Sequence, residues 1–174
     1  MGRVMRLITG LETANLRLGV IGGLLTLGLI GTIVPDVIAR NFLDVALYGM
    51  SEAGVMVLVF VVFLSLPAAQ VNLELYRVSA YDHLLSTRAK RIMDALRYAL
   101  SAAICAGVAY YSILGAVDST LRNEATYTVV PFPVWPGRIS VAIGTMLLAI
   151  QFIADFVRSV SGAERASTEH EPSV

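Results

Sequence analysis

The sequence has 174 residues, of which 56% are hydrophobic and 15% charged, and its formal net charge is zero. A soluble domain carries about 25% charged residues to wet its surface, so this composition, with a mean hydropathy of +0.72, indicates a chain that lies partly in lipid. The balanced charge offers no basic excess for a nucleic-acid partner. The single cysteine excludes an internal disulfide framework and a thiol-pair redox site.

Four apolar runs are long enough to cross the hydrocarbon layer, which takes about 20 residues of helix. We therefore expect an all-α integral membrane domain over residues 1–157. Its spans are expected at about 16–34, 53–69, 98–117 and 138–157. Residues 158–174 are polar and rich in small side chains, which predicts a disordered tail.

The first span has a cleaved signal peptide as its alternative interpretation. Arg3 and Arg6 could form the positive region, and residues 37–39 resemble a cleavage site. However, the apolar run begins only at Leu18, Glu12 precedes it, and it is longer than a typical signal-peptide core. A retained span is favoured.

Lysine and arginine are divided unevenly between the two sides of the membrane. Ten of the thirteen precede the first span, lie between the second and third spans, or follow the fourth. Arg40, Arg122 and Arg138 lie on the other side. The positive-inside rule thus predicts cytoplasmic termini and two outer loops, at 35–52 and 118–138.

The segment 70–97, between the second and third spans, has apolar residues at spacings of three and four. This pattern predicts an amphipathic helix on the inner membrane surface, or a cytoplasmic extension of a spanning helix. Its basic side chains are expected to contact anionic lipid headgroups; they include Arg77, Arg88, Lys90 and Arg91. A solvated, positively charged loop is the alternative.

The stretch "PFPVWPGR", residues 131–138, stands where the chain re-enters the membrane from outside. Trp135 suits the headgroup level, and Pro136 suits the first turn of a helix, where its missing N–H costs nothing. Pro131 and Pro133 keep the approach extended. The stretch is either an interfacial anchor or a rigid outer surface for a partner.

The predicted span interiors contain no Asp, Glu, Lys, Arg or His, although transporters and channels usually place such groups at membrane depth. At the inner ends of the third and fourth spans, Asp94 is expected to pair with Arg97, and Asp155 with Arg158. No catalytic constellation or metal-ligand spacing is present in the sequence. We expect neither an enzyme nor a cofactor.

Small residues recur at four-residue spacing in two spans, which predicts close helix packing in lipid, within this unit or against another chain. They are Gly19 and Gly23 in the first span, and Ala99, Ala103 and Gly107 in the third.

Two outer segments carry a family resemblance. The first, "ARNFLDVALYGMSEAG", supplies Arg40, Phe42 and Glu52, and the second, "FPVWPGRISVAIG", supplies Pro133, Trp135 and Gly144. With the four spans, they resemble the DctQ-type small membrane subunit of TRAP (tripartite ATP-independent periplasmic) transporters. The sequence departs from the family pattern at Gly49, where a Trp is common, and at Leu75 and Ser79, which replace a His and an Asp.

The resemblance implies a multi-pass protein of the bacterial inner membrane with cytoplasmic termini. It implies a stationary scaffold for a large, many-span permease subunit that moves by an elevator motion and holds the substrate and sodium sites. A periplasmic solute-binding protein would deliver an organic acid or a related solute. The outer-side residues would contact either partner, and Arg40 and Glu52 would pair across their loop; these residues are Arg40, Glu52, Pro133, Trp135 and Arg138.

Two other functions stay open. A homo-oligomeric small transporter or channel would need a polar stripe on one helix face, and the spans offer only scattered hydroxyls, at Thr26, Thr32, Ser65, Ser101, Ser112 and Thr145. A non-catalytic accessory subunit of another membrane complex is the second, since the spans lack the His pairs that ligate cofactors.

Overall fold

The computed structural model describes residues 2–45, 47, 49–72, 87–128 and 130–161, apart from the side chains of residues 2–5, 87, 88, 90, 91 and 161. Four helices follow one another, α1 (Gly2–Phe42), α2 (Met50–Val71), α3 (Thr87–Leu121) and α4 (Trp135–Ser161). The described residues form no β-strand beyond one isolated bridge. Each helix is long and apolar enough to cross a membrane, which confirms the expected all-α, four-span architecture.

The helices extend beyond the predicted spans. The 41 residues of α1 make a rod about 60 Å long, twice the hydrocarbon thickness of about 30 Å. α4 continues to Ser161, so the first residues assigned to the tail are helical. Of the predicted amphipathic segment 70–97, residues 73–86 lie outside the described residues, and residues 87–97 form the start of α3, so the amphipathic helix stays a prediction. Residues 162–174 of the tail also lie outside the described residues.

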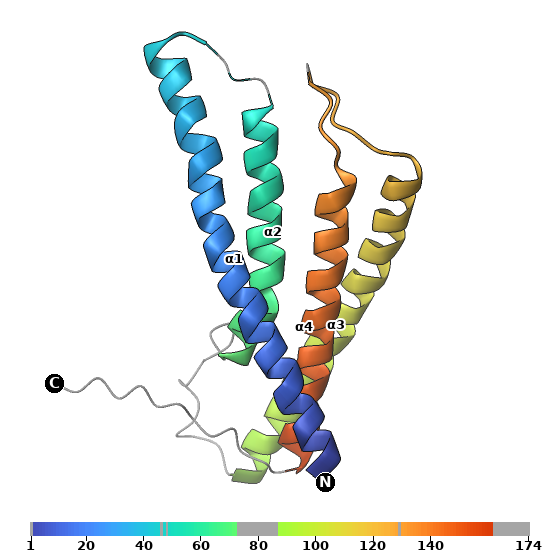
Figure 1. Cartoon of the computed structure of the whole chain (residues 1–174). Helices are drawn as coiled ribbons and strands as arrows, with labels where there is room; N and C mark the ends of the chain where they lie inside the picture. Colours follow the sequence, from blue (N-terminus) through green and yellow to red (C-terminus); the bar gives the residue numbers. More distant parts are fainter. Residues whose placement is uncertain (1, 46, 48, 73–86, 129, 162–174) are drawn as a thin grey trace, which may run out of the picture.

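The helices pack in the order α1, α2, α4, α3 (Figure 1). α4 packs against α3 along one side and α2 along the other, α2 also packs against α1, and α1 meets α4 over a short stretch only. Within the described part of the chain, no Cα atoms within 8 Å of each other join α3 to α1 or α2. The pair α1–α2 leans away from the pair α3–α4 toward the end where α2 and α4 begin.

The core of the unit is α4. Its most apolar window is 56% buried, compared with 22% or less in the other three helices. Its fully buried side chains include Ser140, Gln151 and Phe152. α1 and α3 expose most of their apolar surface, which is expected where lipid or another membrane subunit covers them.

Close contacts at small residues bring the helix backbones together. A Cβ atom on Gly144 of α4 would collide with the backbone carbonyl of Phe63 in α2. On the other side of α2, Gly19 faces Ala68, and Gly22 faces the Ser65 hydroxyl. Because lipid is as apolar as the side chains, such close packing is what holds spanning helices together.

Gly144 is therefore expected to be a sensitive position for stability. Gly144→Leu should force α2 away from α4 and lower the stability by about 1–3 kcal/mol, the usual cost of overpacking. Gly23→Leu is the matched control, because a Cβ atom on Gly23 has no atom within 4 Å. Thermal melting in detergent measures both variants, and equal melting temperatures would contradict the packing account.

Candidate functional site

Polar side-chain contacts gather at the two ends of the bundle. We call the end where α2 and α4 begin the hairpin end, and the end where α1 begins and α4 finishes the terminal end. The outer-side residues predicted from the sequence lie at the hairpin end. The terminal end contains a buried cluster that the sequence analysis did not identify.

At the hairpin end, residues 122–134 connect α3 to α4 as a hairpin-like loop. An isolated antiparallel bridge joins Ala125 to Pro133. The Thr126 N–H donates to the Phe132 carbonyl at 2.8 Å, and the Thr126 hydroxyl accepts from the Phe132 N–H at 3.0 Å. Pro133 is thus held extended, as predicted.

The start of α4 is tied to this loop by an ion pair. Arg138 Nη2 donates to Glu124 Oε1 at 2.8 Å, with both side chains partly exposed. Trp135 and Pro136 form the first turn of α4, as the sequence predicted. Trp135 is half-buried at this level. The stretch therefore joins a braced loop to a helix start.

The connection between α1 and α2 has a different anchor from the one expected. Arg40 pairs with Asp36, one turn earlier in α1, at 2.9 Å. The Ser51 hydroxyl of α2 donates to the same Asp36 oxygen at 3.2 Å. The predicted pairing of Arg40 with Glu52 is wrong, because the nearly buried Asp36 takes the guanidinium instead. Gly49, the departure from the family pattern, has φ +90°, a conformation that suits glycine.

Two of the predicted outer-side residues, Glu52 and Arg138, line the same cavity. It has a volume of about 470 Å³ and lies between the first turns of α2, the hairpin loop and the first turns of α4. Its other lining residues are largely apolar and include Met56, Val59 and Phe132. The cavity opens where the two helix pairs diverge in Figure 1.

At the terminal end, a chain of hydrogen bonds connects three helices. Asn15 of α1 donates through Nδ2 to Gln151 Oε1 of α4 at 2.9 Å, and Gln151 Nε2 donates to Asp155 Oδ1 at 3.2 Å. Gln70 of α2 donates to Asp155 Oδ2 at 2.8 Å. All four side chains are at most 4% exposed. We call them the amide–carboxylate cluster.

The charged pairs near this cluster differ from one of the predictions. Asp94 and Arg97 pair at 3.2 Å, as expected. Arg158 does not take Asp155 as its partner; it forms a two-pronged ion pair with Glu12 of α1, with Nη2 donating to Oε2 at 2.8 Å. The predicted Asp155–Arg158 pair is wrong because the Gln70 and Gln151 amides solvate Asp155 while Arg158 reaches across to α1.

The small residues predicted to pack helices fall into two groups. Gly19 contacts α2 at Ala68, whereas a Cβ atom on Gly23 or Gly107 has no atom within 4 Å. Ala99 and Ala103 are exposed on α3. Packing of these four positions therefore stays a prediction, for contacts outside this chain.

The predicted lipid-contact residues of the inner segment stay untested. Arg77 lies outside the described residues. Arg88, Lys90 and Arg91 lie in the first turns of α3, but their side chains are among those not described.

The described part of the chain offers little chemistry. It contains no group of three or more His, Cys, Asp or Glu side chains that could hold a metal ion. Many of its polar side chains at both ends bond to one another and join helices together. Such an arrangement positions helices and presents surfaces.

The cluster gives a direct test of how the terminal end is held. Gln151→Leu removes the acceptor of Asn15 and a donor to Asp155, leaving buried polar atoms unpaired. We expect a loss of about 1–3 kcal/mol. Thr13→Val is the control, because the exposed Thr13 hydroxyl bonds only a carbonyl of its own helix. Denaturation of both variants in detergent measures the difference, and a Gln151→Leu loss no larger than the control would contradict the cluster's role.

Comparison with known proteins gives a family match but no individual relative. No curated protein and no solved structure matches the chain. The sequence model of one family, described as "Tripartite ATP-independent periplasmic transporters, DctQ component", matches residues 29–162. The match begins in α1 and covers α2, α3 and α4, well over half of the chain. The chain belongs to the DctQ family of small membrane subunits of TRAP transporters.

Proposed function

We propose that this chain is the small membrane subunit of an ion-driven, binding-protein-dependent transporter for organic acids or related solutes. It acts as a stationary scaffold for a large elevator-type permease subunit. The observation that carries the proposal is the family match, since the matched family is a component of tripartite periplasmic transporters. A periplasmic solute-binding protein is the third component.

The internal packing supports a scaffold role. α4 is fixed against α2 at Gly144 and Phe63, and the amide–carboxylate cluster fastens α1, α2 and α4 at the terminal end. Buried amide and carboxylate groups hold a single register, because shifting one helix would leave them unpaired. A subunit built in this way suits the part of a transporter that stays still.

The hydroxyls of the spans support placing the substrate and sodium sites on the large subunit. Thr26, Thr32 and Thr145 donate to carbonyl oxygens of their own helices. Hydroxyls engaged in this way have no proton left to donate to a solute. The same observation disfavours a small channel formed by copies of this chain.

The exposed surfaces supply places for both partners. The apolar faces of α1 and α3 offer area to the large subunit within the membrane. The hairpin end, with Arg40, Glu52 and Arg138, offers charged groups to a solute-binding protein outside it. The excess of lysine and arginine on the opposite side favours cytoplasmic termini in a bacterial inner membrane.

Affinity purification from native membranes tests the proposal. With a tag at the C-terminus, mild detergent extraction and mass spectrometry should recover one large many-span permease at close to one copy per tagged chain. Uptake of organic acids by cells should then require both subunits and the binding protein. An unrelated tagged four-span protein, expressed at the same level, is the control.

Two results of this purification would contradict the proposal. Recovery of the tagged chain alone, as a discrete oligomer, would favour a small transporter or channel. Recovery of the subunits of a different complex, such as a respiratory one, would favour an accessory role.

A further inference from the structure

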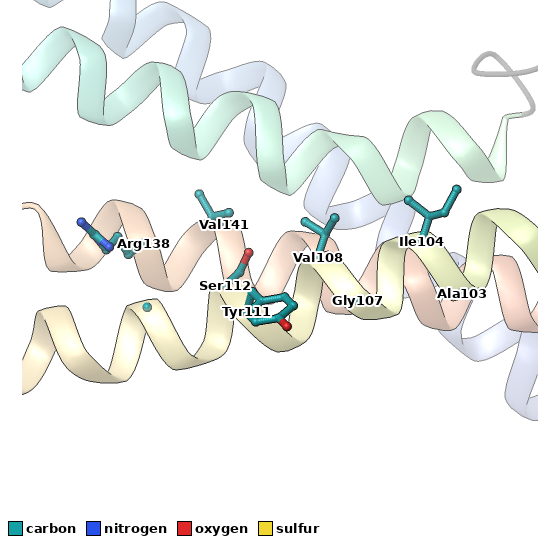
Figure 2. Close-up of a pocket in the computed structure, with 9 residues that line it drawn as sticks. Ala103, Ile104, Gly107, Val108, Tyr111, Ser112, Arg138 and Val141 are labelled. Atoms are coloured by element: carbon teal, nitrogen blue, oxygen red, sulfur yellow. The ribbon is translucent and has the colours of Figure 1, made fainter.

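A groove follows the surface of α3 beside α4 (Figure 2). Its volume is about 610 Å³, and small residues keep it open. Figure 2 shows Ala103 and Ile104 at one end and Arg138 at the other, with Val108 and Tyr111 between them. The complete lining is Ala103, Ile104, Gly107, Val108, Tyr111, Ser112, Gly115, Arg138 and Val141.

The length of the groove and its position along the helices match one leaflet of a bilayer. From Ala103 to Gly115, α3 rises about 18 Å, close to half of the hydrocarbon thickness of about 30 Å. Arg138 lies ten residues from Leu148, the middle residue of α4, or about 15 Å along the helix axis. The guanidinium thus lies at the edge of the hydrocarbon layer, and the groove runs from there to the middle.

Arg138 has donors to spare at this edge. Its Nη2 donates to Glu124, while Nη1 and Nε donate no hydrogen bond to any described residue. Nη1 lies 3.5 Å from the position of a Cβ atom on Gly115, so the missing side chain lets the guanidinium lie over α3. An arginine with free N–H groups is a strong partner for a phosphate, which accepts several hydrogen bonds from it.

The shape of the groove identifies its occupant. A transmembrane helix is about 10–12 Å wide with its side chains and needs a track across about 30 Å, which this groove does not provide. A cavity of about 150 Å³ already holds a benzene ring, so a groove about four times larger accommodates an acyl chain. We propose that it binds one phospholipid of the hairpin-end leaflet, with an acyl chain along α3 and the phosphate on Arg138.

The test uses the full-length purified protein, delipidated in detergent and titrated with phosphatidylglycerol in native mass spectrometry. The wild type should bind one phospholipid. Arg138→Gln removes the phosphate contact, and Gly107→Phe fills the groove without touching Arg138. Arg138→Gln should weaken binding about tenfold or more, the effect of losing a charged hydrogen bond. Gly107→Phe should weaken it by a similar factor because the ring takes the place of the acyl chain.

The chain supplies a matched control for each variant. Arg122→Gln removes an arginine that is also paired, with Asp118, but lies outside the groove. Gly23→Phe fills open space on α1. Both should bind phospholipid like the wild type. Unchanged elution volume and melting temperature would show that a variant is folded, and Gly107→Phe tests the groove even if Arg138→Gln fails to fold.

Other probes separate the possible occupants. Diacylglycerol, which lacks the phosphate, should bind weakly and without dependence on Arg138, and inorganic phosphate alone should not compete. Equal binding by the two groove variants and their controls would overturn the proposal. The proposal would also be overturned if inorganic phosphate competed with the phospholipid and Gly107→Phe left binding unchanged. These two results together would indicate a free-anion site. A photo-crosslinker at Ile104 that captures another polypeptide in the native complex would overturn the proposal as well.

Discussion

The close approach of α2 and α4 is the contact on which the rest of the structure depends. Inside a bilayer, burying apolar surface against another helix gains little over leaving it in lipid, so association relies on tight packing and hydrogen bonds. Gly144 provides the closest packing, because it presents no side chain to the Phe63 carbonyl. With α2 fixed on one side of α4, α3 packs on the other and α1 joins through α2. Without the close contact at Gly144, the two helix pairs would be held together mainly by the polar contacts at the terminal end.

The two ends of the bundle differ in how tightly their helices are joined. At the terminal end, Asn15, Gln70, Gln151 and Asp155 form a buried chain of hydrogen bonds across three helices, and a Glu12–Arg158 ion pair lies near it. At the hairpin end, a cavity of about 470 Å³ lies between α2 and α4, and the groove of about 610 Å³ along α3 begins; Arg138 lines both. A unit fixed at one end and open at the other fits a subunit whose remaining surface is completed by lipid and partners. Arg138 lies between the cavity and the groove.

The sequence predicted the spans and the re-entry stretch because both follow from local rules. Runs of apolar residues identify spanning helices whatever their neighbours are, and Pro136 and Trp135 suit a helix start at a membrane interface. Local spacing predicted the Asp94–Arg97 pair but not the other polar contacts. Asp155 and Arg158 have the spacing of a local pair, yet Arg158 pairs with Glu12 of α1, and Asp155 accepts from Gln70 of α2 and from Gln151 of its own helix. Arg40 pairs with Asp36, one turn earlier in the same helix, and not with Glu52 across the loop.

The sequence did contain one sign of the amide–carboxylate cluster. Gln70 and Gln151 stand beside or within apolar runs, and buried amides require hydrogen-bond partners. To predict the packing of Gly144, one must know where α2 and α4 cross, and a single sequence does not contain this information.

As a stationary scaffold, this subunit is expected to stay rigid while its partner moves, and a cross-link tests this expectation most directly. Met56 of α2 and Gly137 of α4 face each other at the hairpin end, where a Cβ atom on Gly137 would lie 2.8 Å from the Met56 sulfur. A complex carrying Met56→Cys and Gly137→Cys, with Cys105→Ala to remove the only native thiol of this chain, can be joined there by a short thiol cross-linker. If the subunit is a stationary scaffold, solute uptake by the cross-linked complex in proteoliposomes should stay within about twofold of the uncross-linked complex. If uptake is lost on cross-linking and returns when a cleavable linker is cut, α2 and α4 must separate during transport. That result would contradict the scaffold role.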